Sequence, residues 1–161
     1  MIYYIEHDSP LGPLLLAATA RGLCGIYFAE HKHFKGHQDW RHDASNACLL
    51  QTARQLDEYF AHRRTRFDLP LDMDGGTEFQ RTVWQELTTI PFGCSASYAA
   101  LAQRIGKPRA VRSVGAANGR NPLSIVVPCH RVIGASGALT GYAGGLERKA
   151  YLLALEGLKF K

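Results

Sequence analysis

The amino-acid sequence predicts an α+β fold in two parts: an N-terminal antiparallel β-sheet with a covering helix over residues 1–74, and a mostly α-helical C-terminal domain over residues 75–161. Short apolar runs separated by turn signals fill the first part, as expected for antiparallel strands. Apolar residues at helical spacing dominate the second part. With 161 residues, of which 46% are hydrophobic, the chain is long enough to bury a core.

Three strands are expected in the first part, at Ile2 to Ile5, Pro13 to Ala18 and Leu23 to Phe28. Turn signals at Ser9-Pro10-Leu11-Gly12 and at Ala20-Arg21-Gly22 separate these runs. The turns favour strands that run antiparallel to one another.

A polar, histidine-rich stretch follows, and we expect a loop from Glu30 to Asp43. Apolar residues at helical spacing predict a helix from about Ala44 to Ala61, which would cover the sheet. Arg66 to Leu69 is a candidate further strand, and Pro70 to Gly76 looks like the connector between the two parts.

The second part opens with a capping box at Thr77-Glu78-Phe79-Gln80, which starts the first of four expected helices. A second helix runs from Ser97 to Gly106, and a third starts at Lys107-Pro108 and continues to about Ala117. Two short helices joined by a tight turn that contains glycine are typical of a helix-turn-helix, whose second helix commonly contacts DNA. A final helix is expected from about Gly145 to Leu155.

The charge of the chain is unevenly placed. Residues 1–80 carry a net charge of −3, whereas residues 81–161 carry +8. From Leu87 to Leu146 there is no carboxylate side chain, and six basic residues lie in that window: Arg104, Lys107, Arg109, Arg112, Arg120 and Arg131. A polyanion could approach such a face without electrostatic repulsion. DNA is a candidate, because contacts between basic side chains and phosphates supply most non-specific DNA affinity. A solvated basic surface is the alternative interpretation.

Cys129 follows a largely apolar run from Ser124 to Val127 and directly precedes His130. A cysteine attacks as thiolate, but an unperturbed thiol has a pKa of about 8.5 and is mostly protonated at neutral pH. An imidazole can take the proton directly or through a water, and a carboxylate on its other nitrogen would fix the tautomer. The only carboxylate side chains that follow are Glu147 and Glu156, and spacing does not choose between them. The residues alone leave two interpretations open, a nucleophile or a small buried hydrophobic residue.

We expect a cytosolic protein with free thiols and no metal site. The N-terminus lacks the basic region of a signal peptide, and no apolar run approaches the roughly 18 residues of a membrane span. The four cysteines form no CxxC pair, and His31, His33 and His37 are expected in a loop, without the four ligands that a structural zinc needs.

The motif Pro128-Cys129-His130-Arg131-Val132, with Asn121-Pro122 before it and Gly141-Tyr142-Ala143-Gly144-Gly145 after it, resembles the O6-alkylguanine-DNA alkyltransferase family. The similarity extends from Thr77 to Gly157. The chain most resembles the constitutive bacterial members. That resemblance implies a ribonuclease H-like N-terminal sheet domain and a C-terminal alkyl-transfer domain with a winged-helix-like helix-turn-helix.

The resemblance also implies a catalytic group. By position, Cys129 is the alkyl acceptor, His130 acts on it through a bound water, and Glu156 is hydrogen-bonded to His130. Asn121 resembles the residue that braces the turn near the active site.

Two further sets of residues are implied to contact the substrate. Arg112 resembles the arginine that fills the gap left by an extruded nucleotide, and Tyr98 the residue that crowds the 3′ phosphate. The other positions expected against DNA, on its minor-groove side, are Ala110, Gly115 and Arg120. The guanine is expected to meet Tyr142, Ala143 and Gly144. Without the resemblance, the two tyrosines are ordinary half-buried aromatics and Arg112 is a surface phosphate contact.

The activity implied is DNA repair by direct reversal, in which an alkyl group passes from O6-alkylguanine to Cys129 after base flipping, with O4-alkylthymine as a second candidate substrate. The product is a thioether, which water cannot hydrolyse as it does a thioester, so each molecule would act once. No cofactor is expected, and the protein is expected to act as a monomer, with cooperative binding along DNA left open. The alternatives are a non-catalytic protein that binds DNA lesions and a Cys-His hydrolase.

Overall fold

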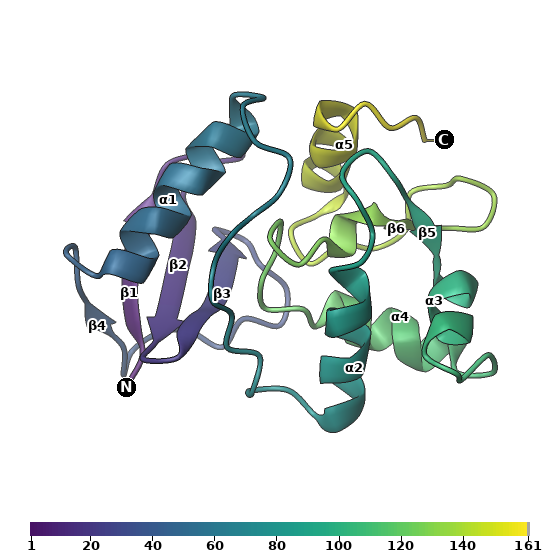
Figure 1. Cartoon of the computed structure of the whole chain (residues 1–161), viewed down its shortest axis with the longest axis horizontal. Coiled ribbons are helices and arrows are strands. Elements are labelled where there is room, and N and C mark those ends of the chain that lie inside the picture. The colour runs from purple at the N-terminus through teal and green to yellow at the C-terminus, as the bar shows by residue number, and fades with distance from the viewer. Residues whose placement is uncertain (161) are drawn as a thin grey trace. The chain divides into compact units, whose positions relative to one another are not determined.

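The computed structural model describes residues 1–160, and the chain divides into two compact units with the boundary in the sequence between Gly75 and Gly76 (Figure 1). The predicted α+β class is confirmed: the first unit is built on a sheet and the second is mainly helical. None of the helices in the described part of the chain combines the length and apolar character needed to cross a membrane.

The N-terminal sheet has the strand order β3-β2-β1-β4. Strands β1 (Tyr3–His7), β2 (Leu14–Thr19) and β3 (Gly22–Phe28) are antiparallel neighbours, as predicted. The fourth strand, β4 (Arg41–His42), pairs with β1 in parallel, so the expectation of a purely antiparallel sheet, with only a loop from Glu30 to Asp43, was wrong. The returning chain satisfies the backbone groups at the open edge of β1, a need that the polar composition of this stretch did not show.

Helix α1 (Ala47–Phe60) covers one face of this sheet (Figure 1). The strand register places Ile5, Leu16 and Ile26 side by side, and all three side chains are buried. Leu56 of α1 is likewise fully buried, so the apolar stripe of the helix and the apolar side of the sheet form the core of the unit.

The candidate strand at Arg66 to Leu69 does not form. The Gln55 side chain forms hydrogen bonds with backbone groups that a neighbouring strand would otherwise pair with. Its amide nitrogen donates to Asp68 O (3.0 Å), and its oxygen accepts from Asp68 N (2.9 Å). Pairing with β3 is limited to a single bridge between Leu23 and Leu71.

Up to residue 160, the C-terminal unit contains four α-helices, a 3-10 turn and two short parallel strands. These elements are α2 (Glu78–Leu87), β5 (Ala96–Ser97), α3 (Tyr98–Arg104), α4 (Val111–Gly119), η1 (Cys129–Arg131), β6 (Val132–Ile133) and α5 (Leu146–Leu155). The predicted capping box is confirmed, since Thr77 and Gln80 exchange side-chain and backbone hydrogen bonds. The predicted helix start at Ser97 is confirmed as well, because Ser97 caps α3.

Helices α3 and α4 form the helix-turn-helix, but the second helix begins later than predicted. Lys107 to Ala110 form a turn closed by a hydrogen bond from Ala110 N to Lys107 O (2.9 Å), and the first helical bond runs from Val114 N to Ala110 O (2.8 Å). Trp84 of α2 donates its indole N–H to Ala117 O (2.8 Å), which anchors α4 against the rest of the unit.

Candidate active site

The Asn121 side chain organises the loop that leads to Cys129. Its amide nitrogen donates to Val127 O (2.8 Å), and its oxygen accepts from Leu123 N (3.0 Å), so one side chain bridges both ends of the loop. Between these points Ile125 has a φ of 74°, a left-handed conformation that is strained for a β-branched residue. The buried Ile125 side chain and the two Asn121 bonds hold this backbone in place.

Cys129 starts the 3-10 turn η1, directly after Pro128, and is only 3% exposed. Burial raises the pKa of the Cys129 thiol to about 11, while a hydrogen bond from Asn121 and the positive charge of Lys149 act to lower it. The resting group is therefore the protonated thiol, and an attack by sulfur requires a base to remove the proton.

His130, the next residue, is fully buried, and its Nε2 donates to Glu156 Oε2 (2.8 Å). Because a carboxylate can only accept, Nε2 carries the ring hydrogen and Nδ1 keeps a lone pair. Nδ1 is buried and has no hydrogen-bond partner among residues 1–160. Burial lowers the pKa of His130, against the opposing effect of Glu156, so the imidazole is neutral and its Nδ1 can act as a base.

The second candidate carboxylate, Glu147, lies exposed in the first turn of α5, whereas Glu156 is buried just beyond the end of that helix. The geometry therefore pairs His130 with Glu156, a choice that sequence spacing alone left open.

Arg131 is part of this site, which the sequence analysis missed. Its guanidinium makes a two-pronged contact with Glu156, Nε to Oε1 at 2.8 Å and Nη2 to Oε2 at 3.0 Å, and its Nη1 donates to Ile90 O (2.6 Å). The interpretation of Arg131 as part of an exposed basic face was wrong, since the residue is only 6% exposed. Its charge balances the buried carboxylate that holds His130.

Lys149 was also missed. It lies on α5, is fully buried, and burial lowers its pKa to about 8, with Cys129 acting to raise it. Its Nζ donates to Val132 O (2.6 Å), Thr140 O (3.2 Å) and Thr140 Oγ1 (3.4 Å). A signal was available, because Lys149 precedes the buried Leu152 by three residues and so occupies the apolar face of the helix.

The two tyrosines named from the sequence lie in different parts of the unit. Tyr98 begins α3, is half-buried, and its Oη lies 2.5 Å from Thr140 Oγ1. Its ring lies against Gly115 of α4, where an added Cβ would come 3.7 Å from the ring. Tyr142, followed by Ala143 and Gly144, lies in the loop before α5, and all three are buried.

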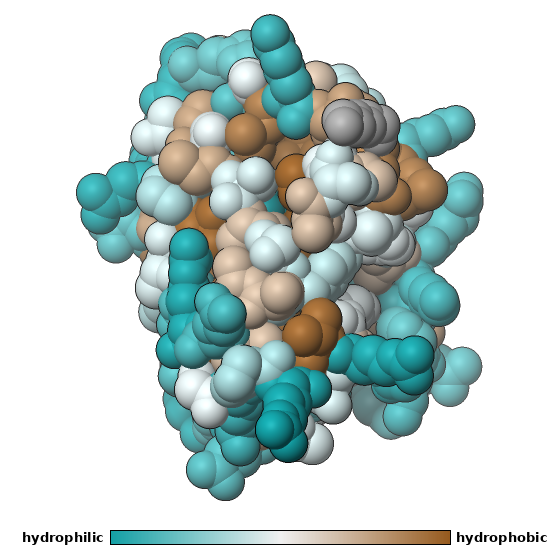
Figure 2. All heavy atoms as spheres, turned by 90° about the vertical axis from the view of Figure 1, so that its right-hand side faces the viewer, coloured by the Kyte–Doolittle hydropathy of each residue, from teal (hydrophilic) through white to brown (hydrophobic). Residues whose placement is uncertain are grey.

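The residues named for DNA contact lie on or beside α4. Arg112 is exposed in its first turn, Arg120 is exposed at its C-terminal end, and Ala110 occupies the N-cap position. In Figure 2, hydrophilic side chains project around a strip of weakly polar and apolar residues on one face of the molecule.

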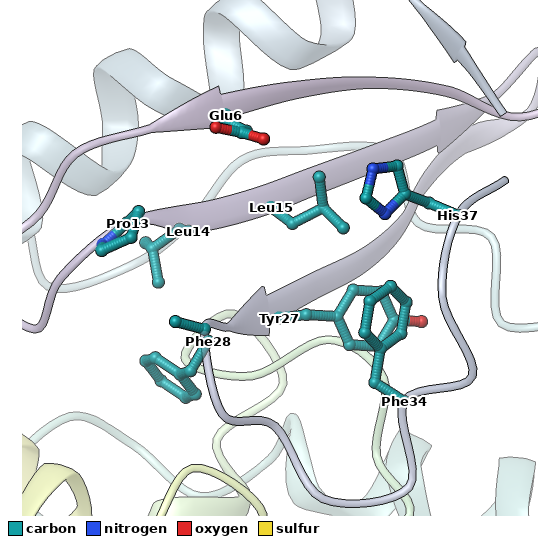
Figure 3. Close-up of a pocket in the computed structure, with 9 residues that line it drawn as sticks. Glu6, Pro13, Leu14, Leu15, Tyr27, Phe28, Phe34 and His37 are labelled. Atoms are coloured by element: carbon teal, nitrogen blue, oxygen red, sulfur yellow. The ribbon is translucent and has the colours of Figure 1, made fainter.

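A separate pocket of about 250 Å³ lies in the N-terminal unit, against strands β1 to β3 (Figure 3). The rings of Tyr27 and Phe34 stack there with centroids 4.3 Å apart, and Glu6 and His37 also contribute to the lining. None of its lining residues is a cysteine. Within residues 1–160, no three histidine, cysteine, aspartate or glutamate side chains are grouped so that they could hold a metal ion.

Known proteins match the chain over nearly its whole length. The family model described as the 6-O-methylguanine DNA methyltransferase DNA binding domain matches residues 78–158, and the ribonuclease-like domain of the same protein matches residues 2–73. The methylated-DNA–protein-cysteine methyltransferase of Mycobacterium tuberculosis H37Rv is 48% identical over 156 residues, which cover 97% of this chain and 93% of the relative. The constitutive enzyme of the same name from Bacillus subtilis 168 is 44% identical over 168 residues, covering 100% of this chain and 99% of its own.

A solved structure agrees with these matches. The crystal structure of Mycobacterium tuberculosis OGT in complex with DNA has a TM-score of 0.88 and 47% identity, and the match covers 96% of this chain and 92% of that one. Fold and site define a protein class in which a helix-turn-helix unit carries a buried cysteine next to a neutral imidazole. The chain belongs to the 6-O-methylguanine DNA methyltransferase family, which confirms the resemblance found in its sequence.

Proposed function

We propose that this protein repairs alkylated DNA by direct reversal, moving the alkyl group of O6-alkylguanine onto Cys129 in a single turnover. The observation that carries the proposal is the unpartnered Nδ1 of His130, a buried base next to a buried thiol in the family's cysteine motif. The names of the relatives, methylated-DNA–protein-cysteine methyltransferases, support the same reaction.

The first step is removal of the thiol proton. A water held between Cys129 and His130 Nδ1 passes the proton to the imidazole, while Glu156 accepts the Nε2 hydrogen bond and stabilises the imidazolium that forms. Lys149 and the Asn121 hydrogen bond stabilise the thiolate, because both lower the pKa of Cys129 against its burial. Neither effect requires a cofactor.

The second step is in-line displacement at the alkyl carbon. A sulfur lone pair forms the new S–C bond, the C–O6 bond breaks, and its electrons remain on the guanine, which takes up a proton and stays in the DNA as the normal base. Tyr142 and the backbone amides around Ala143 and Gly144 stabilise the negative charge that develops on the guanine. The resulting thioether on Cys129 has no carbonyl for water to attack, so the protein is consumed.

DNA is held by the helix-turn-helix in the minor groove. The small residues Ala110 and Gly115 let α4 approach the sugar-phosphate backbone, and Arg120 contacts a phosphate. Arg112 fills the gap left by the extruded nucleotide, and Tyr98 crowds the 3′ phosphate and favours rotation of the base. Base extrusion is required because the alkylated oxygen otherwise lies inside the duplex.

The two parts of the chain have different roles in this proposal. Residues 75–161 bind DNA and carry out alkyl transfer. Residues 1–74 support that domain and do not bind DNA, because their net charge is negative. The protein acts in the cytoplasm as a monomer.

The proposal is tested by incubating the protein with a duplex that contains O6-methylguanine and measuring its intact mass. The expected result is one added methyl group in the wild type and none in Cys129→Ala. Tight binding with unchanged mass would instead support a non-catalytic lesion-binding protein, and repeated turnover would support a Cys-His hydrolase.

A further inference from the structure

Three polar side chains from different elements of the C-terminal unit meet near Cys129, close enough for Tyr98 and Lys149 to interact electrostatically with its thiol. Tyr98 comes from the start of α3, Thr140 from the loop after β6, and Lys149 from α5. Thr140 Oγ1 lies 2.5 Å from Tyr98 Oη and 3.4 Å from Lys149 Nζ, so the threonine hydroxyl bridges the other two groups.

The direction of the hydrogen bonds made by Lys149 follows from counting hydrogens. A lysine ammonium has three N–H donors and no acceptor. Lys149 Nζ has three oxygen partners, Val132 O at 2.6 Å, Thr140 O at 3.2 Å and Thr140 Oγ1 at 3.4 Å, which is one for each hydrogen. The Thr140 hydroxyl oxygen is therefore an acceptor toward Lys149.

Either hydroxyl can donate in the Thr140–Tyr98 pair, and donation by Thr140 uses the one hydrogen that its contact with Lys149 leaves free. Tyr98 Oη is the only acceptor found for it among residues 1–160, and the O···O distance of 2.5 Å is at the short end for a hydroxyl pair. With its oxygen accepting from Thr140, Tyr98 turns its own hydrogen away from the threonine. Because the Thr140 oxygen accepts a hydrogen bond from the Lys149 ammonium, the Thr140 O–H bond is polarised. Its hydrogen bond to Tyr98 polarises the Tyr98 hydroxyl in turn, which makes that hydroxyl a stronger donor.

We infer that Thr140 is a positioning residue that relays the charge of Lys149 to Tyr98 and orients the Tyr98 hydroxyl as a hydrogen-bond donor toward the DNA. The inference rests on the proposed function, which places Tyr98 against the substrate. The acceptor is an oxygen or nitrogen of the extruded nucleotide, either on its phosphate or on its base.

The surroundings of Tyr98 and Lys149 suit this role. The Tyr98 ring lies against Gly115 of the DNA-facing helix, so its hydroxyl and α4 belong to one packed group. Burial raises the pKa of Tyr98, so the phenol keeps its hydrogen at neutral pH. Burial lowers the pKa of Lys149 only to about 8, so most molecules carry the ammonium charge at pH 7.

The test uses two substitutions at Thr140 in the full-length protein. Thr140→Val keeps the shape of the side chain and removes the hydroxyl, whereas Thr140→Ser keeps the hydroxyl. Single-turnover methyl transfer from an O6-methylguanine duplex is measured over a range of DNA concentrations. We expect Thr140→Val to lose about tenfold in transfer efficiency and Thr140→Ser to stay within about twofold of the wild type, in line with loss of one polarised hydrogen bond. A slower transfer rate at saturating DNA assigns the acceptor of the Tyr98 hydrogen bond to the base. A weaker apparent affinity for DNA with an unchanged rate at saturation assigns that acceptor to the phosphate.

A double-mutant cycle with Tyr98→Phe separates positioning from a structural effect. If Thr140 acts through the tyrosine hydroxyl, Thr140→Val causes no further loss in the Tyr98→Phe background. Fully additive losses, or a Thr140→Ser variant as slow as Thr140→Val, would overturn the inference. Failure of the proposed function is distinguishable, because the wild type would then transfer no methyl group at all. Thermal unfolding of each variant shows whether it is folded.

Discussion

The buried cluster of His130, Arg131 and Glu156 gives the sharpest prediction, for the substitution Glu156→Gln. Glu156 accepts from His130 at 2.8 Å and from Arg131 at 2.8 and 3.0 Å, and all three side chains are less than a tenth exposed. A glutamine would leave the Arg131 guanidinium buried without a counter-charge, which typically costs about 3–5 kcal/mol. At roughly 4 °C or more per kcal/mol for a domain of this size, the C-terminal unit should unfold at least about 12 °C lower.

The double variant Glu156→Gln/Arg131→Met separates this structural cost from the chemistry. Removing both charges should restore most of the lost unfolding temperature, because no unpaired ion remains. Methyl transfer should stay about 10- to 100-fold slow, since no carboxylate stabilises the imidazolium of His130. Calorimetry and single-turnover transfer on the same preparations measure both quantities. A double variant that transfers at the wild-type rate would refute a role for Glu156 beyond balancing the charge of Arg131. A Glu156→Gln variant with the unfolding temperature of the wild type would show that the unpaired Arg131 charge does not destabilise the unit.

Three further predictions concern the base, the thiol and the DNA contact. Because burial lowers the pKa of His130, the unfolded chain binds a proton at a pH where folded His130 stays neutral, so the free energy of unfolding should fall as the pH drops below about 6.5. In urea unfolding, the free energy of unfolding of His130→Gln should depend less steeply on pH than that of the wild type. An equal pH dependence would contradict a buried, neutral His130. Lys149→Met should slow iodoacetamide labelling of Cys129 several-fold without DNA, because a nearby positive charge is lost; unchanged labelling would count against Lys149. Arg112→Ala should slow repair of a duplex about tenfold while leaving that labelling unchanged, and the exposed Arg63→Ala, outside the DNA-binding unit, should change neither.

Much of the fold could be predicted because helix caps and turns depend on residues that lie close together in the sequence. The capping box at Thr77 and the start of α3 at Ser97 were identified correctly, since a side chain that caps a helix lies within three residues of its partner. The failed strand at Arg66 to Leu69 and the unexpected β4 depended on long-range partners, Gln55 and the edge of β1, which no local pattern encodes.

The site was predictable where it depends on the motif and unpredictable where it depends on packing. Cys129, His130 and Asn121 are close in sequence, and the structure brings them into one loop and turn. Charged residues are usually exposed, so Arg131 and Lys149 were interpreted as surface charge or overlooked. Only the fold shows that each has buried oxygen partners, Glu156 and Ile90 for Arg131, and Val132 and Thr140 for Lys149.

Direct reversal requires that Cys129 accept one alkyl group per protein molecule. Titrating the protein with a duplex that carries labelled O6-methylguanine, followed by peptide mapping, measures both the stoichiometry and the site. We expect transfer to saturate at one methyl group per protein chain, all of it as a thioether on Cys129. Transfer beyond that ratio, or label on Cys24, Cys48 or Cys94, would rule out single-turnover repair at Cys129.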